Sequence, residues 1–182
     1  MSRFLTRQIS LIAGLIFSAS AFAADETVKH RITGLFAPER EADLRVALES
    51  LSEIKLVSVD FEHGEATFTY DPAVAFKGTK PAEIIKNFDE RLRSASRGTL
   101  GVQPLLTTPK EQLTRVEIPV FGLDCKGCAL AAYEAVGKLE GVAQATVDLK
   151  QGRVTALIDP AKASRATLEE ALKKKGVGLS EK

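Results

Sequence analysis

The chain contains an internal repeat, which restricts its fold more than any other feature. The segment from Gly34 to Pro72 can be laid on the segment from Gly122 to Pro160 without a gap, at a constant shift of 88 positions. Identities fall at turn glycines, apolar positions and a shared Asp-Pro pair, where a common structure would require them. We therefore expect two related domains. The identical pairs are Gly34/Gly122, Leu35/Leu123, Ala47/Ala135, Leu51/Leu139, Val59/Val147, Asp60/Asp148, Gly64/Gly152, Thr67/Thr155, Asp71/Asp159 and Pro72/Pro160.

Each copy has the same order of predicted elements, which is clearest in the second copy. Alternating apolar residues predict a strand over 116–120, and apolar residues at helical spacing predict a helix that stops near Gly141. A hairpin that turns at Gln151-Gly152, a second helix and a closing strand over 177–179 follow. This βαββαβ order is that of the ferredoxin-like fold. We expect an α+β protein with two ferredoxin-like domains in tandem after a signal peptide.

The first residues predict export. Arg3 and Arg7 precede a mainly apolar stretch, 9–17, which is followed by the small-residue pattern Ala21-Phe22-Ala23. This combination is typical of a secretory signal peptide, with a predicted cut after Ala23. The apolar stretch is shorter than the roughly 20 residues that a membrane-spanning helix needs. We expect a periplasmic or otherwise exported protein that does not insert into the membrane after signal cleavage.

The expected domain boundaries follow from the repeat and from one irregular segment. Residues 94–112 contain glycines and prolines and show no sustained period, which is typical of a linker. The predicted organisation is a signal peptide over 1–23, a first domain over 24–93, a linker over 94–112 and a second domain over 113–182.

Charge and motif content exclude several functions. The chain has 25 Lys and Arg against 24 Asp and Glu, so it lacks the basic excess typical of a nucleic-acid-binding protein. No Ser/His/Asp constellation, phosphate-binding glycine loop or convincing carboxylate pair occurs. We expect neither a nucleic-acid partner nor an enzyme.

The two cysteines, Cys125 and Cys128, are separated by two residues at the predicted start of a helix. The oxidising compartment of an exported protein favours disulfides. A cross-link that closes so short a loop, however, gives little stabilisation through the entropy of the unfolded chain. We therefore expect the pair to serve chemistry instead of acting as a staple. The helix N-terminus and Lys126 favour thiolates, and two thiolates suit copper(I), zinc and similar ions.

The segment Gly122-Leu123-Asp124-Cys125-Lys126-Gly127-Cys128, inside a βαββαβ unit, resembles the heavy-metal-associated domain of copper chaperones, periplasmic mercury-binding proteins and metal-transporting ATPases. The resemblance covers about 113–179, and the first copy extends it in degenerate form over about 28–92. It implies that Cys125 and Cys128 bind a metal ion and pass it to a partner by exchange of thiolate ligands. The partner would be a membrane metal transporter or another metal-binding protein.

Two residues of this loop bear on how closely it follows the family pattern and on which metal it binds. Leu123 stands where the family usually has Met, and this volume-conserving change should be tolerated in the core. Asp124 is the residue type that zinc, cadmium and lead exporters often carry there, so its carboxylate is a possible third ligand. The alternative is that Asp124 only caps the helix or its loop. Copper(I), zinc, cadmium and mercury all remain open.

The first copy has lost the cysteine site, because Ala37 and Arg40 occupy the positions of Cys125 and Cys128. We expect this copy to serve in docking, dimer formation or partner recognition. Two other functions compete with metal transfer for the intact site. One is a dithiol-disulfide oxidoreductase, which also uses Cys-x-x-Cys, and the other is a protein-interaction module whose cysteines rest as a disulfide.

Overall fold

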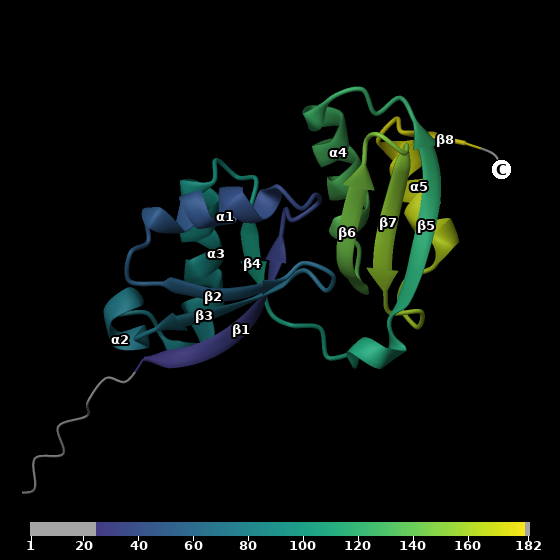
Figure 1. Ribbon diagram of the computed structural model, residues 1–182. Coiled ribbons are helices and arrows are strands. Elements are labelled where there is room, and N and C mark those ends of the chain that lie inside the picture. Colours follow the sequence, from purple (N-terminus) through teal and green to yellow (C-terminus); the bar gives the residue numbers. More distant parts are fainter. Residues whose placement is uncertain (1–24, 181–182) are drawn as a thin grey trace, which may run out of the picture.

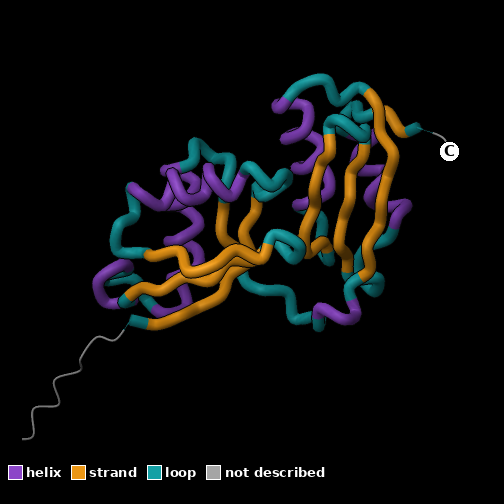
Figure 2. Tube along the Cα trace, in the orientation of Figure 1, coloured by secondary structure: helices purple, strands orange, loops and turns teal. Residues whose placement is uncertain are grey.

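The computed structural model describes residues 25–180, so the predicted signal peptide lies outside the described residues. Each of its two domains has a four-stranded antiparallel sheet with helices on one face (Figures 1 and 2). The first domain consists of β1 (Glu26–Thr33), α1 (Arg40–Glu49), β2 (Lys55–Asp60), β3 (Glu65–Tyr70), α2 (Pro72–Ala75), a 3₁₀ turn (Pro81–Glu83), α3 (Ile84–Ala95) and β4 (Gly101–Gln103). A second 3₁₀ turn (Lys110–Gln112) precedes the second domain, which consists of β5 (Thr114–Phe121), α4 (Lys126–Gly137), β6 (Val142–Asp148), β7 (Arg153–Ile158), α5 (Arg165–Lys174) and β8 (Gly178–Leu179).

The strand order is the same in both domains. It is β2-β3-β1-β4 in the first and β6-β7-β5-β8 in the second. In each sheet, the first and third strands of the domain pair at the centre, and every pairing is antiparallel. This order, with a helix after the first and third strands, is the ferredoxin-like arrangement. The predicted fold, two such domains in tandem, is confirmed.

The repeat also extends to individual hydrogen bonds. The amide of Ile32 donates to the carbonyl of Gly64 at 2.7 Å, and 88 positions later Val120 donates to Gly152 at the same distance. Both glycines have positive φ, 65° and 59°, which a residue with a Cβ atom rarely adopts. The identities at these glycines therefore reflect a turn that both domains need.

Each domain has its own hydrophobic core. The first core contains a cluster of aromatic side chains among aliphatic ones, and the Phe68 and Phe88 rings meet edge to face with centroids 5.0 Å apart. Smaller aliphatic side chains fill most of the second core, between α4, α5 and the sheet. One residue of the first domain, Phe36, belongs to the second core. The two domains are therefore in direct contact.

The predicted end of the first domain needs correction. Residues 101–103, which we assigned to the linker over 94–112, form β4 and pair with β1 at Arg31, Ile32 and Thr33. Val102 is 2% exposed, so this strand is part of the first core. Three residues are too few to show a two-residue period, and flanking Gly and Pro residues are typical of a loop. The first domain ends at Gln103 and not at residue 93.

Among residues 25–180, no helix has both the length and the apolar character that crossing a membrane would require.

Candidate metal-binding site

The cysteine loop connects the end of β5 to the start of α4 on the surface of the second domain. Gly122 has φ +78°, which allows the chain to turn as it leaves the strand. The next side chain, Leu123, is 8% exposed and packs in the second core. This placement agrees with the expected core role of Leu123, and it fixes the loop one residue before Asp124.

Cys125 is the N-cap of α4. Its backbone is extended, with φ −147° and ψ 159°, and its Sγ accepts a hydrogen bond from the backbone N–H of Cys128 at 3.0 Å. Such a cap satisfies one of the backbone N–H groups that the first turn of a helix leaves without a partner. The same N–H groups and the helix dipole favour negative charge on the sulfur. The local fold therefore supports a thiolate at Cys125.

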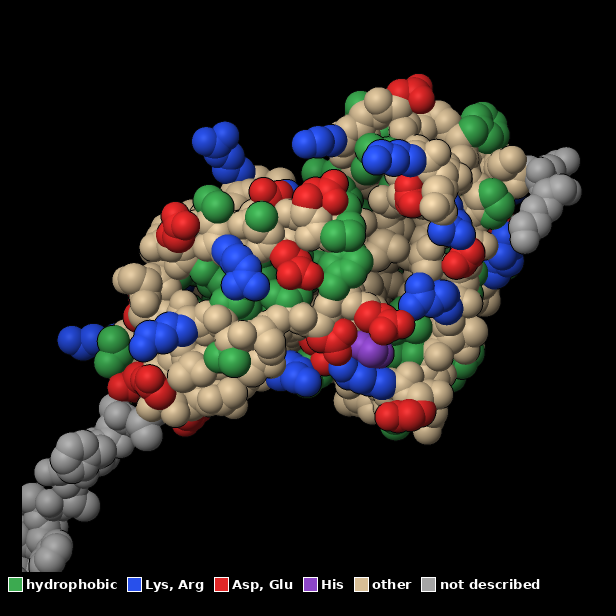
Figure 3. Space-filling model, in the orientation of Figure 1, with side chains coloured by type: hydrophobic (Ala, Val, Ile, Leu, Met, Phe, Trp, Pro, Cys, Tyr) green, Lys and Arg blue, Asp and Glu red, His purple; other side chains and the backbone are tan. Residues whose placement is uncertain are grey.

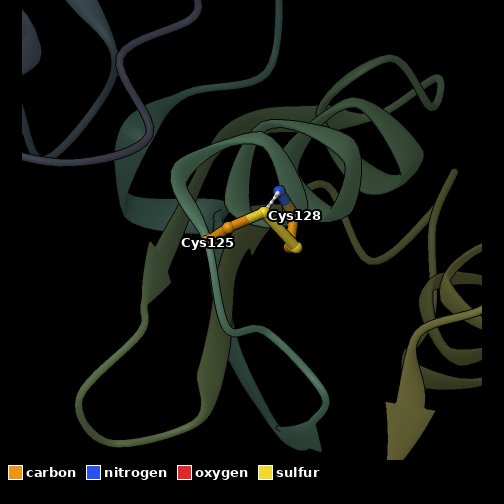
Figure 4. The surroundings of a disulfide bond; sticks show 2 residues. All are labelled: Cys125 and Cys128. Carbon is orange, nitrogen blue, oxygen red and sulfur yellow. Dashed lines mark hydrogen bonds between the residues drawn. A yellow bond between two sulfur atoms is a disulfide. The ribbon is translucent and has the colours of Figure 1, made fainter.

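The two sulfur atoms are joined in a disulfide, and Figure 4 shows this bond at the start of the helix. We expected the short spacing to disfavour a cross-link, and the structure differs from that expectation. The two Cα atoms are 5.1 Å apart, inside the usual range for bridged cysteines. A small loop limits the stabilisation that a disulfide gives, but it does not prevent the bond from forming.

Most of the cysteine loop is exposed to solvent. Cys125, Lys126 and Gly127 are exposed, whereas Cys128 is half-buried and packs against the second core. Reduction of the disulfide would therefore give one sulfur at the surface and one held by the domain. Two such sulfurs on the first turn of a helix can bind a single ion.

Asp124 is exposed beside the cysteines. The cap of α4 is Cys125, so the alternative that Asp124 caps this helix finds no support in the helix geometry. Among the described residues, no group of three or more His, Cys, Asp or Glu side chains is arranged to hold a metal ion. The disulfide-bonded structure therefore does not assemble a three-ligand site, and the role of Asp124 as a third ligand remains a prediction.

The corresponding loop of the first domain has a different use. Arg40, at the position of Cys128, donates from Nε to the Gly34 carbonyl at 3.1 Å and from a terminal nitrogen to the Thr99 hydroxyl at 2.9 Å. It also forms an ion pair with Asp43. These bonds fix the loop and leave it no soft ligand, since Ala37 and Arg40 cannot supply one.

Both histidines lie in the first domain. His30 is 7% exposed, and its Nε2 is 3.4 Å from the hydroxyl of Tyr70. His63 has its Nδ1 2.9 Å from a carboxylate oxygen of Asp60. Each imidazole therefore has a polar neighbour within its own domain, and neither completes a ligand set in the described structure.

Residues 117–177 match the family model of the heavy-metal-associated domain. The second domain is a heavy-metal-associated domain. The match confirms the resemblance that the cysteine loop and the βαββαβ order indicate. The first domain shares the fold of this heavy-metal-associated domain, but the family match does not include it, so its descent from the same family stays a prediction.

Curated relatives of the chain are metal-transporting ATPases. A zinc-transporting ATPase from Synechocystis is 34% identical over 74 residues, which are 41% of this chain and 10% of the relative. Copper-transporting ATPase 1 from Mus musculus is 22% identical over 168 residues, which are 86% of this chain and 11% of the relative. The chain thus spans about a tenth of the length of these relatives.

Solved structures of small metal-handling proteins also resemble one domain of this chain. The CopZ metallochaperone is 25% identical, with a TM-score of 0.36, and the match covers 37% of this chain and all of CopZ. Oxidized MerP from Ralstonia metallidurans CH34 is 28% identical, with a TM-score of 0.36, and the match covers 37% of this chain and 94% of MerP.

The residues that join the two domains lie outside every motif of the sequence. Phe36, Tyr133 and Gln144 make these contacts, and they pair across the repeat with Asp124, Arg45 and Leu56. Each pair differs in chemical character. Positions where two copies of a fold differ in this way are candidates for a contact between the copies, and this signal was present in the sequence.

Proposed function

We propose that this is an exported protein that binds one thiophilic metal ion through reduced Cys125 and Cys128 and passes the ion to a partner. The observation that supports this most directly is the position of the two sulfurs. They meet on the exposed first turn of α4, where the Cys128 amide donates to the sulfur of Cys125. Preformed hydrogen bonding at that point lowers the cost of forming two adjacent thiolates.

Binding begins with two-electron reduction of the disulfide by the dithiol of a separate thiol reductant, which is itself oxidised to a disulfide, because only free thiolates act as ligands. Each thiol that enters the site in its protonated form loses its proton, so binding releases protons. The exposed Cys125 would be the sulfur that an incoming thiolate of the partner displaces, while the half-buried Cys128 holds the ion during exchange. The ion is the cargo of this process, and the protein returns to the empty dithiol.

The chemistry of the loop limits the cargo to soft or borderline ions, namely copper(I), zinc, cadmium or mercury. The relatives include both a zinc-transporting and a copper-transporting ATPase, so the relatives do not identify which of these ions is bound. Asp124 would add an oxygen ligand that suits zinc or cadmium better than copper(I). The proposed partner is a membrane metal transporter or another metal-binding protein, and the proposed location is the periplasm or another exported compartment.

Metal titration of the reduced full chain tests this proposal. Copper(I), zinc and mercury(II) are added separately under anaerobic conditions, in competition with a chelator of known affinity. We expect one equivalent bound and proton release, with loss of tight binding in the Cys125→Ser, Cys128→Ser double variant. The oxidised parent is a matched control, because it has the same sequence and lacks free thiolates. Equal binding by the parent and the double variant would refute the proposal.

The disulfide favours a second candidate function, a dithiol-disulfide oxidoreductase or an interaction module with a resting disulfide. Turnover of insulin reduction or of a disulfide-exchange substrate would support the first of these. A disulfide in protein isolated directly from its compartment, together with no metal uptake after reduction, would support the second. In the second case the metal titration would give no stoichiometric binding.

A further inference from the structure

The loop of the first domain that corresponds to the cysteine loop lies against the edge of the second sheet. This loop, Gly34–Arg40, is hereafter the docking loop. Its Phe36 carbonyl accepts a hydrogen bond from the backbone N–H of Val147 at 2.8 Å. Val147 belongs to β6, the edge strand of the sheet order β6-β7-β5-β8. The docking loop therefore covers part of a strand edge whose amides would otherwise face solvent.

Gln144 of β6 forms the polar centre of this contact. Its side chain is 5% exposed, and its Nε2 donates to the carbonyls of Leu35 and Phe61, each at 3.0 Å. Its Oε1 accepts from the amide of Ala145 at 3.0 Å. Both ends of the amide are thus satisfied, and both donated bonds go to the first domain. A buried amide that bonds in this way is costly to leave unpaired.

Tyr133 connects the docking loop to the helix that carries the cysteines. It lies on α4, is 5% exposed, and its hydroxyl accepts a hydrogen bond from the Gly34 amide at 2.7 Å. Its ring lies against the Phe36 ring, with centroids 5.7 Å apart. The Arg40 guanidinium is 5.3 Å from the centre of the Phe36 ring. Phe36 is therefore close to one side chain of its own domain, Arg40, and to one of the second domain, Tyr133.

The linker is fixed to both domains, independently of the docking loop. The Lys110 ammonium is 2.8 Å from carboxylate oxygens of both Asp60 and Glu65 in the first domain. The Thr108 hydroxyl donates to the carboxylate of Asp159 in the second domain at 2.6 Å. A linker held at two points favours one arrangement of the domains, the arrangement that the docking loop also requires.

This arrangement places the first domain beside the cysteine loop. A groove of about 750 Å³ runs between the domains, and its walls include Glu39 and Asp43 at the start of α1 and Lys126 and Gly127 of the cysteine loop. Figure 3 shows apolar side chains reaching the surface at the junction between the domains. The first domain therefore lies on the side of the cysteine loop where Lys126 and Gly127 line this groove. Among the described residues, Phe121 at the end of β5 is 62% exposed and lies outside the lining of the groove.

We propose that the first domain is a fixed shield for the cysteine site. Its docking loop, organised by Arg40, restricts the macromolecules that can reach Cys125 and Cys128. A protein partner must then contact the cysteine loop from the flank that Phe121 marks. The statement about a protein partner rests on the proposed metal transfer. The contact between the domains and the shielding of the cysteines are properties of the reduced protein without metal.

The test uses the full chain, reduced and metal-free, with Gln144→Glu as the main variant. This nearly isosteric change replaces the donating amide by a carboxylate oxygen that faces the Leu35 and Phe61 carbonyls, so it should open the contact. Gln151→Glu is the matched control, since it makes the same chemical change at an exposed turn residue. Tyr133→Phe is a milder variant that removes only the acceptor for Gly34.

Amide hydrogen exchange and thiol reactivity provide the two measurements. In Gln144→Glu we expect the Val147 and Gly34 amides to exchange at least about tenfold faster than in the parent, while amides of β3 and β7 stay protected. Tyr133→Phe should accelerate Gly34 alone. A polyethylene-glycol maleimide should react with the thiols several-fold faster in Gln144→Glu, while N-ethylmaleimide reacts at the same rate in both proteins.

Two results would overturn the proposal. One is exchange of the Val147 and Gly34 amides in the parent as fast as in exposed turns, which would show that the domains are not docked. The other is faster exchange in Gln144→Glu with an unchanged ratio of bulky to small maleimide rates, which would show docking without shielding. Neither measurement involves a metal ion. Failure of the shielding proposal can therefore be distinguished from failure of the proposed metal binding.

Discussion

The backbone N–H of Cys128 donates a 3.0 Å hydrogen bond to the sulfur of Cys125, so the two sulfurs of the site have unequal surroundings. Cys125 is exposed and receives this bond, whereas Cys128 is half-buried and packs against the second core. The difference bears on which sulfur reacts first after reduction, and it gives the first prediction.

In reduced protein treated with a limiting amount of iodoacetamide, Cys125 should be alkylated before Cys128. Its exposure and its position at the helix N-terminus both favour attack by the thiolate. Peptide mass spectrometry measures the ratio of the two products. The Cys128→Ser variant, which keeps only Cys125, should react at a rate close to that of the fast site of the parent. Equal alkylation of both cysteines would contradict the proposed asymmetry.

The Asp124→Asn change should weaken zinc and cadmium binding more than copper(I) binding. It would remove the proposed oxygen ligand and its charge while keeping the size of the side chain. We expect a loss of about 10- to 100-fold for zinc, by analogy with the loss of groups that support metal ligands. Competition with chromophoric chelators measures each affinity. The control is Glu111→Gln, which removes the same charge from an exposed residue that is distant in sequence from the cysteine loop. Asp148→Asn is unsuitable as a control, because the Asp148 carboxylate accepts a hydrogen bond within a turn. Equal losses for zinc and copper(I) would remove Asp124 from the ligand set.

Replacing Arg40 by Ala should destabilise the first domain by about 1.5–3 kcal/mol, the usual range for losing hydrogen bonds to a charged group. The side chain is 14% exposed and bonds to Gly34 and Thr99, so these acceptors lose their partner. Urea unfolding followed by circular dichroism measures the change. Arg45→Ala, on the exposed face of the same helix, should stay within about 0.5 kcal/mol. Equal effects of the two changes would show that Arg40 does not organise the docking loop.

The first domain should lose stability as the pH falls below the ordinary histidine range. Burial lowers the pKa of His30 below its usual 6.5. Below about pH 6.5, His30 therefore binds a proton more readily in the unfolded chain than in the folded one. Stability then rises with pH through this window and is lost on acidification. Comparing urea midpoints at about pH 7.5 and about pH 5.5 measures the effect. His30→Gln should reduce the difference between the two midpoints, and an unchanged difference would contradict this assignment.

Asp60, a carboxylate of the same domain, loses its stabilising contribution at a lower pH than the pH at which the loss from His30 begins. Burial alone would raise the pKa of Asp60, but hydrogen bonds from Lys110 and His63 lower it to about 2. A carboxyl whose folded pKa is depressed stabilises the protein above its unfolded pKa and loses this contribution only as the pH falls toward the folded value. Loss from Asp60 therefore occurs below about pH 4, whereas the loss assigned to His30 begins near the ordinary histidine pKa of about 6.5.

Much of the fold could be predicted because its determinants are local. Positive-φ glycines such as Gly64 and Gly152, and alternating apolar residues, occur at the same offset in both copies. The strand β4 escaped prediction because three residues between glycines and a proline show no period. Its place in the sheet depends on pairing with β1, about 70 positions earlier, and no nearby residue signals a partner at that distance.

The place of the two cysteines at the start of a helix was predictable for the same reason, since the whole motif lies within the seven residues of its loop. Their role as metal ligands stays a prediction. The bond between the sulfurs was not predictable, because redox state depends on the surroundings as well as on the spacing. The contacts between domains were also missed. They join residues such as Gly34 and Tyr133, which are 99 positions apart, and a periodic pattern carries no information about such pairs.

The hydrogen bond from Val147 to Phe36 also has a practical consequence for the second domain on its own. A fragment that begins near Thr114 would expose the unpaired backbone groups of the edge strand β6 and the ring of Tyr133 to water. Concentrated samples of that fragment should self-associate, since an open edge of this kind is a template for joining a second chain. Affinities measured on the fragment would then describe an aggregate that the complete polypeptide avoids by folding back on itself.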